Sequence, residues 1–248
     1  HVNANLYAGS GGITLREARA VNGDRYATTI LAPGTDPLLD DAEEAGVGVV
    51  RLERLRGGRR IAPWRDVEAI RELERHLRAG RFDLVHTHAG RAGAVGRIAA
   101  RRAGVRAVVH TLHGFPFNAF QPAPTRRALL EVERRLGRLT DWFLTDGTFV
   151  AAEAVRLRIA PPDRIRALIS PIDPVEPATP RTRRVARALL GLPDGVKAIG
   201  TTARLAVQKA PLDMVRAVAL LRREDVRLIW VGDGELRAAT ERLIAREG

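Results

Sequence analysis

Short apolar runs alternate along the chain with longer stretches in which apolar residues recur at helical spacing. Runs of the first kind predict strands, and stretches such as the one with Val67, Ile70, Leu73 and Leu77 on one face predict helices. Regular alternation of strand and helix is typical of a parallel α/β sheet. The strands predicted in the first two thirds of the chain cover residues 2–7, 26–32, 47–52, 82–86, 105–111, 142–145 and 165–169.

A proline-rich stretch interrupts this alternation. Residues 171–180 hold four prolines, a composition that ends regular structure and suits a linker. After it, strands predicted at 198–202 and 226–231 restart the pattern among helices. We therefore expect a first domain over 1–173, a linker over 174–180 and a second domain over 181–248, which is too short to be complete.

Two neighbouring strands of the first domain end in histidines. His86 and His88 are two apart and should face the same way, and His110 and His113 end the next strand. Open α/β sheets bind ligands at such strand ends. His113, which precedes Gly114 and aromatic residues, is the best candidate for a substrate contact, whereas His86 is about as well explained as a residue that hydrogen-bonds neighbouring loops.

The same histidines have the chemistry of metal ligands. However, no carboxylate lies among them in the sequence at ligand spacing, and no His-Glu-x-x-His motif is present. We therefore predict no metal site.

A glycine loop joins the first predicted strand to the first predicted helix. Gly9-Ser10-Gly11-Gly12 in this position is the arrangement that cradles anions. Thr14 stands where the dinucleotide fingerprint would have its third glycine, and no Gly-Lys-Ser/Thr follows. A nucleotide cofactor at this loop is not supported.

Cationic residues follow the first strand of the second domain. Arg204 and Lys209 could clamp a diphosphate there, the arginine through paired hydrogen bonds and the lysine as a point charge. Gly232 and Gly234 follow the next strand, where they either bring backbone N–H groups to a ligand or form a tight turn.

The balance of charge narrows the classes of partner. Among 248 residues, 41 lysines and arginines outnumber 29 acidic residues, which gives a net charge of +12 and favours polyanions. No apolar run is long enough for a membrane span, and there are no cysteines. We expect a cytoplasmic protein, with peripheral contact to the anionic inner face of the membrane as a further expectation.

Taken in order, these motifs resemble the retaining glycosyltransferases of family 4. The resemblance covers nearly the whole chain and rests on stretches that are weak singly but specific as an ordered set. They are Gly11-Gly12, residues 83–88, Gly90-Arg91-Ala92-Gly93, residues 110–115, Ala203-Arg204-Leu205 with Gln208-Lys209, and residues 231–236.

The resemblance implies the GT-B fold of two Rossmann-like parallel-sheet domains, and transfer of a sugar from a nucleotide-sugar donor to a saccharide or lipid-linked acceptor. Gly11 and Gly12 would then lie near the acceptor and the donor phosphates, and His113 beside the transferred sugar. Arg204 and Lys209 would neutralise the departing diphosphate. His88, Gly114, Gly232 and Gly234 complete the expected substrate contacts, and neither a metal nor a cofactor beyond the nucleotide-diphosphate sugar is required.

The chain departs from the family pattern at several points. Ser170-Pro171-Ile172-Asp173 lacks the usual glycine, Thr202-Ala203 replaces Val-Gly, and Ala210 stands where a glycine usually follows the lysine. The family's Glu-x7-Glu segment would lie beyond Gly248. We therefore expect a truncated chain that is inactive by itself.

Two other functions stay open. A nucleotide-sugar epimerase of the same fold would convert its donor with no acceptor present. A basic nucleic-acid-binding module is suggested by charge alone, and the chain shows neither aromatic platforms nor a binding motif for it; we expect no nucleic-acid partner.

Overall fold

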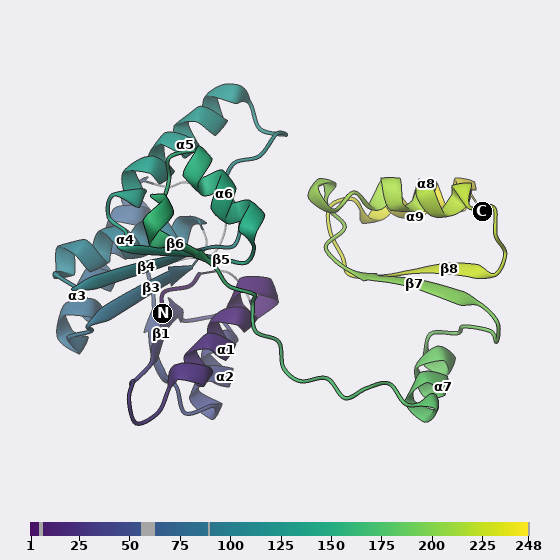
Figure 1. The fold of residues 1–248 in the computed structure, drawn as a ribbon, viewed down its shortest axis with the longest axis horizontal. Helices are drawn as coiled ribbons and strands as arrows, with labels where there is room; N and C mark the ends of the chain where they lie inside the picture. The colour runs from purple at the N-terminus through teal and green to yellow at the C-terminus, as the bar shows by residue number, and fades with distance from the viewer. Residues whose placement is uncertain (5–6, 56–62, 89, 248) are drawn as a thin grey trace. The chain divides into compact units, whose positions relative to one another are not determined.

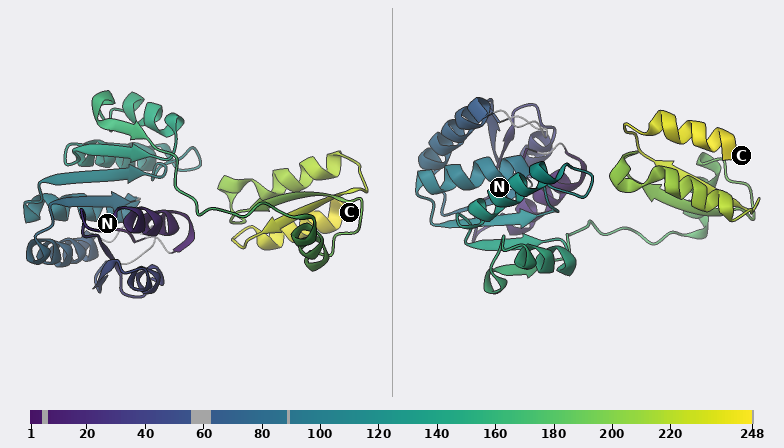
Figure 2. Two further views of the ribbon diagram at one scale, coloured as in Figure 1. Left: turned by 60° about the horizontal axis from the view of Figure 1, so that its bottom comes forward. Right: turned by 90° about the horizontal axis from the view of Figure 1, so that it is seen from above.

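The computed structural model describes residues 1–4, 7–55, 63–88 and 90–247. The chain divides into two compact units, His1–Asp173 and Pro174–Gly248. No helix or strand forms between residues 168 and 179, which join them (Figure 2).

Every strand pair of the first unit is parallel. β1 (Thr29–Pro33) pairs with β2 (Gly48–Leu52), and β3 (Leu84–His88), β4 (Ala107–Leu112), β5 (Trp142–Thr145) and β6 (Ile165–Ala167) follow one another across a four-stranded group. Val2 bridges both groups, because it pairs with Leu31 on one side and Thr87 on the other.

The helices cover both faces of this sheet. α1 and α2 lie on one face, and α4, α5 and α6 lie on the other (Figure 1). A π-helix, η1, precedes α1, and the 3-10 helix η2 (Pro162–Arg164) precedes β6. The bounds are η1 Tyr7–Gly11, α1 Gly12–Val21, α2 Leu38–Glu44, α3 Pro63–Gly80, α4 Gly90–Ala103, α5 Ala123–Gly137 and α6 Thr148–Arg156.

The strand order reverses at Val2. From this central segment the chain moves outward through β1 and β2 and then crosses back to β3 on the other side of Val2. Open parallel sheets bind ligands at the carboxyl ends of the strands that flank such a switch point. The glycine loop and the end of β3 are the segments that meet there.

Each face has its own hydrophobic core. Leu15, Ile30 and Leu38 are buried between the sheet and α1 and α2, whereas Leu73 and Val95 belong to the core under α3 and α4. The second face also buries a charged pair. Arg97 of α4 and Glu133 of α5 have side-chain exposures of 0% and 4%, and Arg97 Nη2 donates to Glu133 Oε2 at 2.9 Å.

The second unit is a smaller parallel α/β structure. β7 (Lys197–Thr202) pairs in parallel with β8 (Val226–Val231). Around them lie α7 (Pro180–Leu189), the 3-10 helix η3 (Val207–Lys209), α8 (Pro211–Leu220) and α9 (Arg237–Glu247). The predicted α/β class with parallel sheets is thus confirmed in both units.

Two differences between the predicted and observed elements exceed a shift of three residues at an end. Of the strand expected over Val2–Tyr7, Val2 forms isolated bridges and Tyr7 belongs to η1, while residues 5–6 lie outside the described residues. The Asn3 side chain turns to Ser10 O and Thr14 Oγ1. The short helix α2 was not predicted. The arginine- and glycine-rich composition of residues 54–60 predicts a loop, and residues 56–60 of it lie outside the described residues.

Among the described residues, no helix is both long enough and apolar enough to cross a bilayer.

Candidate functional site

His113 is held between two side chains at the carboxyl edge of the first sheet. It follows β4, and its Nδ1 lies 2.9 Å from Asp146 Oδ2, just beyond β5. Its Nε2 lies 3.3 Å from His88 Nδ1, at the end of β3. Because a carboxylate only accepts hydrogen bonds, His113 donates from Nδ1 and its Nε2 accepts from the N–H of His88.

Asp146 has a second hydrogen-bond partner. The hydroxyl of Ser170 donates to Asp146 Oδ1 at 2.9 Å, and Arg16 of α1 forms an ion pair with Asp173 at 2.7 Å. The stretch 170–173, which departs from the family pattern, is therefore fastened to the edge of the sheet that carries His113.

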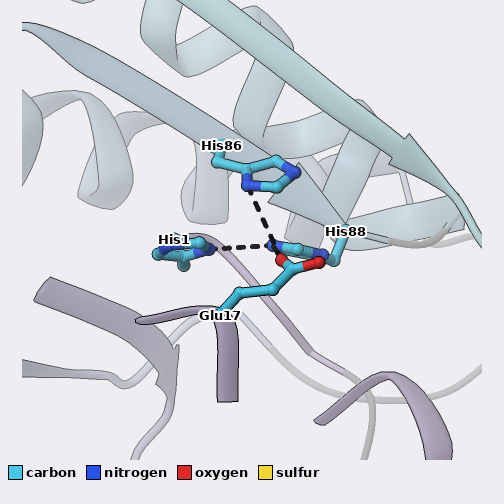
Figure 3. Close-up of side chains that lie close together, drawn as sticks. All are labelled: His1, Glu17, His86 and His88. Carbon is cyan, nitrogen blue, oxygen red and sulfur yellow. Dashed lines mark hydrogen bonds and ion pairs between the residues drawn. The ribbon is translucent and has the colours of Figure 1, made fainter. Parts of the chain in front are cut away.

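His86 and His88 face α1, on the side of the sheet opposite α4. Glu17 of α1 points its carboxylate toward both rings, with Oε2 3.9 Å from His86 Nδ1 and 3.9 Å from His88 Nε2 (Figure 3). The ring of His1 stacks on the same group, with its Nδ1 3.0 Å from His88 Nε2. The prediction that His86 and His88 face the same way is confirmed.

Burial changes the acid–base behaviour of this group. It raises the pKa of Glu17 to about 7, with a further contribution from the negative charge of Asp146. It lowers the pKa of His86 to about 3 and holds the pKa of His88 well below its ordinary value. Both imidazoles are therefore neutral near pH 7.

His110 does not join the other histidines. Its Nδ1 lies 2.8 Å from Thr87 Oγ1, and its ring packs where a side chain on Gly93 of α4 would stand. Thr111 of β4 pairs with His88 of β3, so these two residues face the same side of the sheet. Successive residues of a strand face opposite sides, so His110 faces the side opposite His86 and His88. The sequence-based grouping of His110 with the other three histidines was therefore wrong, and His1 joins that group instead.

The glycine loop is fastened to the central segment of the sheet. Gly11 ends η1 and precedes α1, which Gly12 begins. The Asn3 amide donates to Ser10 O at 3.3 Å and to Thr14 Oγ1 at 2.8 Å. The loop thus lies at the switch point, beside the end of β3.

Gly114 follows His113 in a conformation that favours glycine. Its φ is +135°, and a Cβ placed there would have no heavy atom within 4 Å among the described residues. Beyond it, Phe115 and Phe117 stack with ring centroids 5.2 Å apart. Backbone geometry, rather than lack of space, favours glycine here.

The structure places Arg204 and Lys209 on one turn after β7. Both side chains belong to exposed residues, and η3 carries Lys209. Ala210 then has φ +48° and ψ +50°, the left-handed region that glycine adopts without cost. This geometry explains why a glycine usually follows the lysine.

Gly232 and Gly234 bring the loop after β8 against that turn. A Cβ on Gly232 would meet Ala203 O at 2.1 Å, and a Cβ on Gly234 would meet Leu205 O at 2.5 Å. Leu205 N also donates to Asp233 O at 3.0 Å. Both glycines therefore allow the close approach that supports the backbone on either side of Arg204, and their predicted substrate contacts stay predictions.

Sequence reasoning missed three residues of the site. Asp146 follows a strand directly, so the rule that singled out His88 and His113 would have found it. Glu17 gave a weaker signal, as a polar residue one turn after buried Thr14 on the same helix. His1 stands directly before the central strand segment.

Comparisons with known proteins agree on a family. A family model described as "Glycosyl transferase 4-like domain" matches residues 8–169, more than half of the chain. An Escherichia coli protein named UDP-Gal:alpha-D-GlcNAc-diphosphoundecaprenol alpha-1,3-galactosyltransferase is 26% identical over 93% of this chain and 60% of its own length. A D-inositol 3-phosphate glycosyltransferase of Streptomyces scabiei is 36% identical over 58% of this chain and 33% of its own length.

A solved structure shares the fold. Anabaena HepE, determined in complex with UDP and glucose, superposes with a TM-score of 0.77 at 16% identity, covering 100% of this chain and 67% of that one. The chain spans between a third and two thirds of the length of these relatives. On the evidence of the family match, and as its ordered motifs predict, the chain belongs to the glycosyl transferase 4-like family of glycosyltransferases.

Proposed function

We propose that the full-length protein transfers a sugar from a nucleotide-sugar donor to a lipid-linked saccharide, with retention at the anomeric carbon. The family match over residues 8–169 carries this proposal. The donor is a UDP-sugar and the acceptor a saccharide on a polyprenyl diphosphate, the two substrate classes that the name of the E. coli relative states for that protein.

Arg204 and Lys209 act on the donor diphosphate. As the bond from the anomeric carbon to the diphosphate oxygen breaks, negative charge grows on the leaving group, and prepositioned cations stabilise that charge most in the transition state. The exposure of both residues on one turn after β7 supports this role. With two side chains supplying positive charge, the step requires no metal.

His113 contacts the transferred sugar. Its fixed position between Asp146 and His88 supports this role, because a side chain held by two partners loses little freedom when a substrate binds. Gly114 follows His113, and Gly11 and Gly12 belong to the glycine loop, so we place these glycines near the donor phosphates and the acceptor, as the family resemblance implies.

Double substitution of Arg204 and Lys209 tests the proposal. In the full-length protein, Arg204→Ala with Lys209→Ala should lower kcat/KM for UDP-sugar turnover by at least about 10²-fold, because charge stabilisation of the leaving group is lost. Release of UDP and formation of the lipid-linked product are measured together. Arg216→Ala, which changes an exposed arginine of α8, is the matched control and should leave kcat/KM unchanged.

Unchanged turnover in the double variant would show that Arg204 and Lys209 do not act on the donor diphosphate. Donor conversion with no acceptor present would instead identify an epimerase.

We further propose that the basic protein docks at an anionic membrane surface, where a polyprenyl-linked acceptor resides. The net charge of +12 supports this contact.

A further inference from the structure

Glu17, His86, His88 and His1 gather four potential metal ligands under α1, at the switch point of the first sheet. One ligand atom from each residue lies within 4.8 Å of every other. The side chains come from α1, β3 and the segment that begins the central strand, so the fold assembles a group that no sequence motif contains (Figure 3).

The second nitrogen of each β3 histidine already has a partner. His86 Nε2 lies 2.6 Å from Thr111 Oγ1, and His88 Nδ1 lies 3.3 Å from His113 Nε2. The other nitrogens, His86 Nδ1 and His88 Nε2, face Glu17, and His88 Nε2 also lies 3.0 Å from His1 Nδ1. Histidines that bind metals have this arrangement, in which one nitrogen binds the ion and the other donates to a neighbouring acceptor.

One oxygen of the Glu17 carboxylate, Oε2, is buried without a compensating donor, while the side chain as a whole is 26% exposed. Among the described residues its Oε2 has no hydrogen-bond partner, because both imidazole nitrogens stand 3.9 Å away, beyond hydrogen-bond range. A buried carboxylate oxygen without a donor is unfavourable, and a cation among these atoms would compensate it.

The spacing suits an ion with nitrogen and oxygen ligands. Bonds of about 2.0–2.2 Å in tetrahedral geometry separate ligand atoms by about 3.3 Å. The observed separations of 3.0 Å between His1 Nδ1 and His88 Nε2, and 3.9 Å from Glu17 Oε2 to each β3 histidine, lie on either side of that value. Small side-chain rotations would bring all four atoms onto one ion.

We infer that Glu17, His86, His88 and the ring of His1 form a binding site for a divalent transition-metal ion of the zinc class. Three imidazoles and one carboxylate favour Zn²⁺ over Mg²⁺ or Ca²⁺, which prefer oxygen ligands. The ion joins α1 to β3 beside the glycine loop, and it fixes His88 with its Nδ1 hydrogen directed at His113. This site is independent of the diphosphate chemistry assigned to Arg204 and Lys209.

Metal titration of the full-length protein tests the inference. The protein is purified with a tag that lacks histidine, treated with a chelator and titrated with ZnCl₂ by calorimetry, with MgCl₂ in parallel. We expect one Zn²⁺ per chain and no saturable Mg²⁺ binding at the same concentrations. Glu17→Gln, which keeps the shape of the side chain, should weaken Zn²⁺ binding at least about 10-fold. His76→Asn, which removes a histidine of α3 outside the group, should bind as the wild type does.

A spectroscopic measurement keeps the test independent of variant stability. Co²⁺ bound to the wild type should give the strong visible absorption of tetrahedral coordination, and Zn²⁺ should displace it. His86→Gln should lose that absorption, and circular dichroism checks that the variant is folded. Absence of stoichiometric Zn²⁺ binding in the wild type, or equal binding by wild type and Glu17→Gln, would overturn the inference while leaving the transferase proposal standing.

Discussion

At the scale of single residues, Ala210 shows how a departure from a family pattern has a measurable cost. Its φ of +48° places an alanine Cβ in the left-handed region, where L-residues are strained. Ala210→Gly should therefore raise the free energy of unfolding by about 0.5–1 kcal/mol, less than the full strain because glycine also gains freedom in the unfolded chain. Urea unfolding, followed by a signal that comes from the second unit, measures this change in the free energy of unfolding.

Ala206, on the same turn, is the control. Its φ of −132° is ordinary for any residue, so Ala206→Gly relieves no strain and should lower the free energy of unfolding. Equal effects of the two substitutions would contradict the explanation from backbone strain.

The residue scale is also where sequence reasoning reached its limit. Alternation along a strand was enough to place His86 and His88 on one face, and a strand end was enough to single out His113. The approach of Glu17 to those rings depends on how α1 packs across the sheet, and no spacing in the sequence encodes that distance. A carboxylate 69 positions before His86 is therefore invisible to a search for nearby ligands.

At the scale of elements, α4 and α5 share a buried ion pair whose partners need one another. Burial lowers the pKa of Arg97, and the Glu133 carboxylate opposes that shift. Glu133→Ala should lower the free energy of unfolding by about 3–5 kcal/mol, because it leaves a charged guanidinium uncompensated in the core. Replacing both partners, Arg97→Met with Glu133→Leu, should cost much less than the single change.

Chemical denaturation of the variants measures the difference. Glu131→Ala provides a control on the same helix, since the ion pair of Glu131 with Arg135 is exposed and should contribute no more than about 0.5 kcal/mol. A double variant as unstable as Glu133→Ala would show that loss of packing, rather than an unpaired charge, dominates.

Elements with strong periodicity were predictable, and those that depend on tertiary contacts were not. β5 and β8 have the predicted bounds, because compact apolar runs between turn residues leave few alternatives. α2 has only seven residues and lies between turns, so its periodicity was too short to detect. The first predicted strand was too long, since Tyr7 already belongs to η1.

At the scale of the whole molecule, the excess of positive charge predicts binding to anionic membrane surfaces. The full-length protein should sediment with vesicles containing anionic phospholipid at low salt and should be released as ionic strength rises, because screening weakens attraction to the surface. Vesicles of neutral phosphatidylcholine are the matched control. Binding that is equal on both vesicle types would contradict an electrostatic contact, and tighter binding to RNA than to anionic vesicles would favour a nucleic-acid partner.

The pairing of Val2 with Leu31 and Thr87 has a consequence for synthesis on the ribosome. The segment around Val2 occupies the middle of the sheet, and its partner on the far side is translated 85 residues later. Until β3 leaves the exit tunnel, one edge of this segment has no strand to pair with, and contacts so distant in sequence form slowly. The nascent chain must therefore keep the segment around Val2 unpaired on one side while half of the first unit is made, and chaperones that shield exposed strand edges would act during that interval.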